Sequence, residues 1–288
     1  MPSPTPVIDL HAHSSVSDGT ESPSELVGAA RAAGIDVLAI TDHDTVGGWD
    51  EATDAARRLG LTLVRGIEVS CTFENQSVHL LAYLTDPEDP ALMRELAKAR
   101  DSRATRLARM VELMAADGIP ITYDEVLAQV APGATPGRPH IADALIANGT
   151  ITHRDQAFES WLTDESPYYV HHYSPDPARA VELVRGAGGV PVLAHPFTRT
   201  RGEGVSDELV VELAAAGLAG LEAYHRDHGP EEVARAQALA ERLDLLLTGS
   251  SDYHGTGKRN RLAENTTTPE VLEAIEAASS GVTAVVRP

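Results

Sequence analysis

The chain has 288 residues, 42% of them hydrophobic, and a formal net charge of −20. This length and hydrophobic content allow one large α/β domain with an insertion, or two domains, with a sizeable core. The negative charge argues against non-specific binding of long nucleic acid, whereas it is compatible with a site that holds several cations.

Targeting signals are not visible in the sequence. No apolar run approaches the roughly 20 residues that a membrane helix needs, and residues 1–6 lack the basic and apolar regions of a signal peptide. Cys71 is the single cysteine, so an internal disulfide is excluded and we expect a small buried side chain. The sequence therefore predicts a cytoplasmic protein.

The N-terminal part of the chain alternates between strand and helix patterns. The first expected strand is Val7–His13. The next one, residues 36–41, is continuously apolar, which is typical of a strand buried on both faces. Ser22 and Pro23 suit the cap and first position of a helix, which Gly34 ends. The expected strands cover 7–13, 36–41, 62–69 and 78–84, and the expected helices cover 23–33 and 48–59.

The pattern then becomes helical as far as Trp161, with Gly and Pro between the helices. The expected helices cover 92–116, 123–130, 139–147 and 154–161. Because the alternation of strands and helices resumes afterwards, we interpret this part as a helical insertion into one barrel. The predicted barrel comprises residues 1–90 and 171–288, and the predicted insertion comprises residues 91–170.

The C-terminal part again alternates. We expect strands over 189–194, 220–224 and 245–248, helices over 177–187, 207–216, 231–243 and 269–278, and a last segment over 282–286. About seven or eight strands alternating with helices indicate a closed (β/α) barrel of the α/β class.

Side chains that bind metals recur where the predicted strands end. His11 and His13 are two residues apart in a strand, so they point to the same face and can share a metal. A barrel places its functional site at the carboxyl ends of its strands. A hydrogen-bonded core histidine explains one or two such residues, but not a series. The series is His11, His13, His43, Glu68, His195, His225, Asp252 and His254.

The combined motifs resemble the PHP family, the polymerase and histidinol phosphatase superfamily. They are His11-x-His13, Asp18, Thr41-Asp42-His43, Glu68, Ala194-His195-Pro196 and Ser251-Asp252-x-His254. The resemblance covers nearly the whole barrel. It implies a distorted seven-stranded (β/α) barrel with two or three divalent ions, and Glu68 as the bridging carboxylate. The implied ligands are His11, His13, Asp18, His43, Glu68, His79, His195, Asp252 and His254. His79 differs from the others because it begins an apolar run.

Within this family, the chain resembles the stand-alone phosphoesterases that carry a helical insertion. The resemblance implies activity on 3′,5′-nucleotide bisphosphates, or 5′-to-3′ exonuclease activity on short RNA. The residues that support it are Asp18 and the stretches 137–140, 187–196 and 222–225. His171 departs from the family pattern, since we expect proline there.

Six histidines and three carboxylates suit Mn²⁺, Fe²⁺ or Zn²⁺, and the lack of a thiolate argues against a closed structural zinc site. Clustered ions would hold a bridging hydroxide, neutralise phosphate oxygens and stabilise the leaving alkoxide. We assign catalytic roles to Glu68, Asp252 and His225, the last through contact with the phosphate or the leaving group. Asp42 is expected either to orient an imidazole or to cap a loop.

Candidate phosphate-binding residues lie mostly in the insertion. Arg138 and His140 start a helix, where anions are favoured, although structural capping is the alternative. Arg103 and Arg106 belong to a basic helical stretch that either faces solvent or holds a second phosphate. Lys258 and Arg259 are weaker candidates of the same kind.

The leading hypothesis is a phosphoesterase that removes a phosphate from a small nucleotide with two phosphates. The alternative within enzymes is histidinol-phosphate phosphatase, and Asp18 and the long insertion argue mildly against it. The alternative of another class is a non-catalytic metal-binding regulatory module, against which the complete ligand set argues. A polymerase accessory domain is unsupported, because the chain has no polymerase region. The expected partner is a small phosphorylated substrate, with no membrane and no long DNA.

Overall fold

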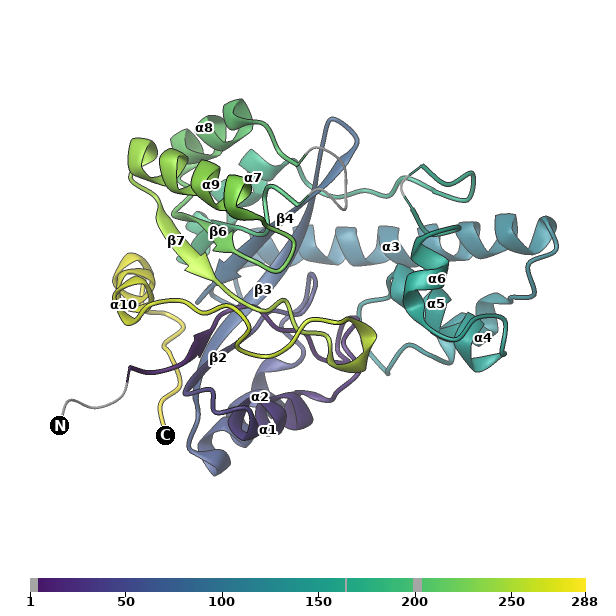
Figure 1. Cartoon of the computed structure of the whole chain (residues 1–288), viewed down its shortest axis with the longest axis horizontal. Coiled ribbons are helices and arrows are strands. Elements are labelled where there is room, and N and C mark those ends of the chain that lie inside the picture. Colours follow the sequence, from purple (N-terminus) through teal and green to yellow (C-terminus); the bar gives the residue numbers. More distant parts are fainter. Residues whose placement is uncertain (1–4, 164, 199–203) are drawn as a thin grey trace.

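The computed structural model describes residues 5–163, 165–198 and 204–288. Within them, seven strands form one sheet in chain order, and the sheet curves into a nearly closed barrel. Helices cover its outside, with α1 and α2 below the strands in Figure 1 and α7, α8 and α9 above them. The strands are β1 (Ile8–Asp9), β2 (Val37–Ile40), β3 (Thr62–Phe73), β4 (Gln76–Tyr83), β5 (Val190–Leu193), β6 (Gly220–Tyr224) and β7 (Leu246–Gly249). The predicted barrel fold with a helical insertion is confirmed.

The helices begin and end close to the predicted residues. At α1, the Ser22 hydroxyl accepts from the Glu25 backbone N–H and the Glu25 carboxylate accepts from the Ser22 N–H, which is a capping box that fixes the helix start. The helices are α1 (Pro23–Ala32), α2 (Trp49–Leu59), α3 (Pro90–Ala116), α4 (Tyr123–Leu127), α5 (Arg138–Ala147), α6 (Arg154–Phe158), α7 (Pro177–Gly186), α8 (Asp207–Ala216), α9 (Pro230–Leu243) and α10 (Pro269–Ala278). A 3-10 turn covers Gly255–Gly257.

The strand β4 runs antiparallel to both of its neighbours, whereas the other neighbouring pairs of strands are parallel. Only Glu74 and Asn75 separate β3 from β4, and both have positive φ, as a tight hairpin turn requires. The amino end of β4 therefore lies at the same end of the barrel as the carboxyl ends of the parallel strands. This explains why His79 begins a strand and still faces the other candidate ligands.

The edges of the sheet, β1 and β7, meet through loops rather than through a regular ladder. The predicted first strand, 7–13, is longer than β1, because the backbone leaves the ladder after Asp9. An isolated parallel bridge then joins Ala12 to Tyr253, and the His13 N–H donates to the Tyr253 carbonyl at 2.8 Å. The segment 282–286 forms one bridge, between Val286 and Leu63, and no longer strand.

The insertion has a hydrophobic core of its own. The first turns of α3 pack on the barrel through Leu92 and Leu96, while the rest of α3 packs with α4, α5 and α6. Figure 1 shows these short helices gathered around the far end of α3, away from the strands. Truncating a buried residue of this core, such as Met110 of α3 or Leu145 of α5, is expected to cost about 2–5 kcal/mol of stability. The exact limits of the insertion, 91–170, stay a prediction.

A membrane-crossing helix is not found in the part of the chain that the structure describes.

Candidate metal centre

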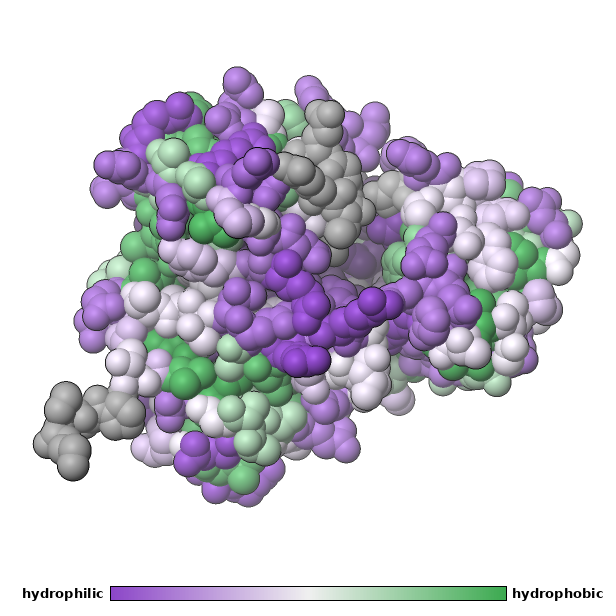
Figure 2. Space-filling model, viewed as in Figure 1, coloured by the Kyte–Doolittle hydropathy of each residue, from purple (hydrophilic) through white to green (hydrophobic). Residues whose placement is uncertain are grey.

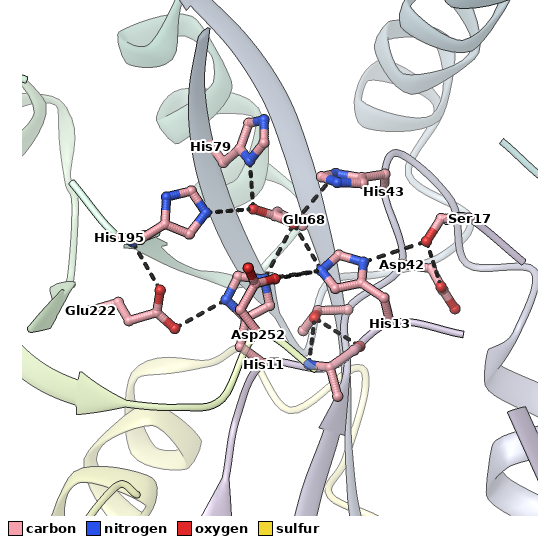
Figure 3. Close-up of polar contacts among 12 residues, drawn as sticks. His11, His13, Ser17, Asp42, His43, Glu68, His79, His195, Glu222 and Asp252 are labelled. Atoms are coloured by element: carbon pink, nitrogen blue, oxygen red, sulfur yellow. Dashed lines mark hydrogen bonds and ion pairs between the residues drawn. The ribbon is translucent and has the colours of Figure 1, made fainter. Parts of the chain in front are cut away.

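Glu68 lies at the centre of a buried cluster of histidines (Figure 3). One of its carboxylate oxygens faces His79 and His195, and the other faces the remaining three rings. The histidines with a ring nitrogen 2.7–3.4 Å from a Glu68 oxygen are His11, His13, His43, His79 and His195. The predicted bridging position of Glu68 therefore has a geometric basis.

The ligand-type atoms fall into overlapping groups whose members lie within 4.8 Å of one another. The groups found among the described residues are His13–Asp18–His43–His254, His11–His13–Glu68–Asp252 and His43–Glu68–His79. We call the first the outer group and the second the inner group. His195 adjoins them through Glu68, so the structure brings together all nine predicted ligands.

These side chains lie at the ends of strands and in loops with strained backbone conformations. His79 pairs with Ser70 in the β3–β4 ladder, two residues beyond Glu68. His195 and Asp252 follow β5 and β7 with positive φ angles of 28° and 51°, which non-glycine residues rarely adopt. Asp18 is brought back toward His13 by a tight loop in which a Cβ at Gly19 would collide with the His13 carbonyl.

Two buried carboxylates behind the cluster were missed by the sequence analysis. Glu222 of β6 accepts from His11 Nδ1 at 3.0 Å and from the His195 backbone N–H at 2.8 Å. Asp9 accepts from the backbone N–H groups of Ser251 and Ala263, and burial raises the pKa of its carboxyl to about 6. A carboxylate inside an otherwise apolar strand was the available signal for both. An outer partner such as Glu222 fixes the tautomer and direction of a ligand imidazole, whereas Asp9 holds the backbone next to Asp252.

Asp42 caps a loop, which was one of its two predicted roles. Its carboxylate accepts from the Ser14 N–H at 2.8 Å and from the hydroxyls of Ser14 and Ser17. Ser17 in turn lies 3.4 Å from His13 Nδ1. Asp42 is thus linked by hydrogen bonds to the His13 imidazole through this serine.

The charges in the cluster depend strongly on one another. Burial alone would lower the pKa of His13, but the carboxylates of Asp252 and Glu68 that face its ring outweigh burial and raise the pKa to about 9. Burial would likewise raise the pKa of Glu68, yet the surrounding histidines hold it well below its usual value. At His254 burial prevails, and its pKa is lowered to about 4.

The donor set fits divalent cations. Ring nitrogens of His11 and His13 face each other at 3.1 Å, which two adjacent imidazoles sustain only with a shared proton or a cation between them. Within the described residues, His43 Nδ1, His254 Nε2 and Asp252 Oδ1 are buried without a hydrogen-bond partner. Mixed nitrogen and oxygen ligands of this kind match Mn²⁺, Fe²⁺ or Zn²⁺.

A cavity of about 720 Å³ lies between this cluster and the insertion. Figure 2 shows a recess there, with hydrophilic residues gathered beside it. From the barrel, the lining includes Asp18, His43, His79, His195, Asp252 and Lys258. From the insertion and the segment after it, the lining includes Arg103, Arg106, Arg138, Arg154, Phe158 and His172.

Three arginines and one histidine form what we call the arginine cluster: Arg103, Arg106, Arg138 and His172. Arg103 pairs with Asp44 at 3.0 Å and donates to the Ser70 hydroxyl. Arg106 donates to His172 Nδ1 at 2.9 Å, and the Arg138 guanidinium lies over the Tyr169 ring while it donates to the Leu162 carbonyl. These side chains are held in place at the cavity and do not lie on a solvated helix face.

His140 and His225 do not line the cavity. His140 is buried, and its Nδ1 accepts from the Gly137 N–H at 3.0 Å, so it performs the capping role that was its alternative. His225 is buried with its Nε2 3.7 Å from Asp252 Oδ2, and its Nδ1 accepts from the Asp227 N–H. His225 therefore lies beside the cluster, whereas His140 lies in the insertion.

The remaining predicted residues separate into two kinds. Lys258 lines the cavity and donates to Asp252 Oδ2 at 2.8 Å. Arg259 is exposed and pairs with Asp155 of α6 at 2.7 Å. The unexpected His171 is also exposed, and it is the next residue, His172, that reaches the cavity. Cys71 is buried, as predicted.

Comparison with known proteins agrees with this site. A model of the PHP domain matches residues 9–120. The chain is 34% identical over 254 residues to the 3′,5′-nucleoside bisphosphate phosphatase of Chromobacterium violaceum, covering 88% of this chain and 89% of the relative. It is 33% identical over 249 residues to a 5′-3′ exoribonuclease of Haemophilus influenzae, covering 85% and 89%. A solved structure of a metal-dependent phosphoesterase from Bifidobacterium adolescentis has a TM-score of 0.92 and 44% identity, covering 96% and 97%.

Proposed function

The chain belongs to the PHP family, and from that membership we propose that it is a metal-dependent phosphoesterase acting on a small nucleotide. The preferred substrate is a 3′,5′-nucleotide bisphosphate, from which the 3′-phosphate is removed. One observation carries this proposal: a single cavity is lined both by residues of a metal-type cluster and by the arginine cluster. A substrate with two phosphates can engage both at once.

The proposed metal ligands are the nine residues predicted from the sequence, held around Glu68. Two or three divalent ions held there would supply a hydroxide nucleophile at neutral pH and would neutralise phosphate oxygens. His11 and His195 are kept in place by Glu222, and His225 holds a proton beside Asp252, near the proposed leaving group. Lys258, close to Asp252, adds positive charge on the same side of the cavity.

The arginine cluster is the proposed site of the phosphate that is not cleaved. Guanidinium groups suit phosphate because they donate parallel hydrogen bonds with full charge. His172 fits the same role as a neutral donor: its Nδ1 accepts from Arg106, so its Nε2 carries the proton. Within the described residues this Nε2 is buried and has no hydrogen-bond partner. We no longer include His140 in the phosphate site, because its ring caps α5.

The test compares substrates that differ by one phosphate. Protein loaded with Mn²⁺ is expected to release phosphate from adenosine 3′,5′-bisphosphate much faster than from AMP. Equal rates on the two substrates would show that the second phosphate does not contribute to substrate recognition. Activity on histidinol phosphate above that on every bisphosphate would instead favour the alternative enzyme. If no combination of metal and phosphate ester gives turnover, the non-catalytic regulatory module becomes the favoured hypothesis.

A second activity, 5′-to-3′ hydrolysis of short RNA, is favoured by the size of the cavity. About 720 Å³ is toward the upper end of the range of roughly 300–1,000 Å³ for small-molecule sites. A relative of similar length carries the name 5′-3′ exoribonuclease. A 5′-phosphorylated RNA pentamer should then yield mononucleotides from its 5′ end, whereas an intact pentamer after long incubation would reject this activity. The cytoplasmic location stays a prediction.

A further inference from the structure

The insertion contacts the loop that carries Asp18. Arg154, the first residue of α6, donates from Nη1 to the Asp18 carbonyl at 3.0 Å. The Thr135 N–H, also in the insertion, donates to the Val16 carbonyl at 2.9 Å. Two residues of the insertion therefore hold the backbone of this loop, on both sides of Ser17.

Arg154 is itself held rigidly. Its Nε and Nη2 donate to the two carboxylate oxygens of Asp143 in α5, at 2.6 and 2.7 Å. Only 8% of the residue is exposed. A paired, buried guanidinium loses little further freedom when it makes a third contact, so it can fix the position of a backbone carbonyl.

The same side chain packs on the loop that carries His254. A Cβ at Gly257 would collide with Arg154 Nη1, so the guanidinium lies directly against the backbone of this loop. The two barrel loops are also joined directly, because the Thr20 N–H donates to the His254 carbonyl at 3.2 Å. Arg154 thus contacts both loops whose side chains, Asp18 and His254, approach each other at 3.2 Å.

The helix α3 holds the third loop of the outer group. Arg100 donates to the Asp44 carbonyl at 2.6 Å, and Arg103 pairs with the Asp44 carboxylate at 3.0 Å, next to His43. The inner group is different, since the partners that hold its residues, Glu222 and Asp9, belong to the barrel.

We infer that Arg154 is a positioning residue that makes cation binding by the outer group depend on the insertion. The inference rests on the proposed metal centre and adds that its sites are unequal. The inner group is built by the barrel alone. The outer group reaches ligand geometry only when Arg154 and α3 hold the loops of Asp18, His254 and His43.

The experiment measures metal binding and not turnover. Chelator-treated protein is titrated with Mn²⁺, and free Mn²⁺ is followed by electron paramagnetic resonance. Arg154→Lys keeps the charge but cannot hold Asp143 and the Asp18 carbonyl together, and Asp143→Asn weakens the pairing from the other side. Asp18→Asn is the reference for loss of the outer group. Arg179→Gln, in an exposed ion pair on α7, is the matched control.

Wild-type protein and Arg179→Gln are expected to bind the same number of ions. Asp18→Asn should lose one of them. Arg154→Lys and Asp143→Asn should weaken the same ion about ten- to hundredfold, the usual effect of removing an outer partner, and leave the others unchanged. In the Asp18→Asn background, Arg154→Lys should have no further effect on Mn²⁺ binding, since the two changes act on one ion.

Two results overturn the inference. The first is that Arg154→Lys and Asp143→Asn bind every ion with wild-type affinity, while Asp18→Asn loses one ion. The other is equal weakening of all ions, which would make Arg154 a general stability residue. Failure of the proposed metal centre would give a different result. Wild-type protein would then bind no more Mn²⁺ than Asp18→Asn does.

Discussion

Two buried or half-buried histidines, His13 of the inner group and His172 of the arginine cluster, have pKa values shifted in opposite directions. In the inner group, carboxylates overcome burial and raise the pKa of His13 to about 9. In the arginine cluster, burial and then Arg103, Arg106 and Arg138 lower the pKa of His172 to about 2. Carboxylates therefore dominate around His13, where a cation is favoured, and guanidinium groups dominate around His172, where an anion is favoured.

In the proposed function, this difference separates two tasks. The barrel holds the groups for the reaction, each fixed by other buried residues. The insertion supplies positive charge some distance along the same cavity, where it can select a substrate without taking part in bond cleavage. Changes in the metal-type cluster should abolish turnover on every substrate, whereas changes in the arginine cluster should alter the choice between substrates.

The largest effect is expected at Glu68. Glu68→Ala removes the carboxylate that faces five histidines, so bound metal and turnover should both be lost. We expect a fall in kcat of at least about a thousandfold, beyond the ten- to hundredfold typical of an outer partner. Steady-state kinetics and metal analysis check this, with the exposed Glu182→Gln as control. Unchanged turnover would show that catalysis does not involve the cluster.

Glu222→Gln should have a smaller effect, because Glu222 holds His11 and His195 without being a predicted ligand. Metal affinity is expected to fall about ten- to hundredfold, while kcat at saturating metal stays close to that of the wild type. Activity measured across a Mn²⁺ titration separates the two quantities. A loss of kcat that excess metal does not restore would place Glu222 in the reaction itself.

Arg106→Gln should change substrate choice. Loss of one charged hydrogen bond, worth about 1.5 kcal/mol, should lower kcat/KM for adenosine 3′,5′-bisphosphate about tenfold. The rate on p-nitrophenyl phosphate, which has a single phosphate, should not change. Arg109→Gln, in an exposed ion pair one turn further along α3, is the matched control. Equal losses on both substrates would argue against a separate phosphate site.

The smallest effect concerns pH and His172. Its folded-state pKa lies below its ordinary value of 6.5, so the folded protein favours the neutral ring. The stability that the neutral ring provides is complete above pH 6.5 and is lost as the pH falls from 6.5 toward 2. Because the ring is partly exposed, we expect about 1 kcal/mol of loss at pH 5. His172→Gln should therefore lose less free energy of unfolding between pH 7.5 and 5 than the wild type, measured by urea titration. Parallel pH curves for the two proteins would contradict the lowered pKa.

The nine predicted ligands lie together in the structure because their signal in the sequence is local, and their role as ligands stays a prediction. Each ligand except His79 ends an apolar run or follows one closely, and a barrel gathers strand ends at one place. The arginine cluster was only partly predicted. Arg103, Arg106 and Arg138 were candidates, but His172 and the anchoring Arg154 were missed, since neither lies in a periodic pattern that relates it to the cavity.

The amino-acid sequence by itself determined the alternation of strands and helices, the helical insertion and the predicted ligands, because these depend on apolar runs, caps and spacing along the chain. The tertiary structure alone decided that β4 is reversed, that Glu222 and Asp9 stand behind the ligands, and that His140 caps a helix. It also decided that Arg154 joins the insertion to the loop of Asp18. Such relations depend on contacts between residues up to 254 positions apart, which no local pattern encodes.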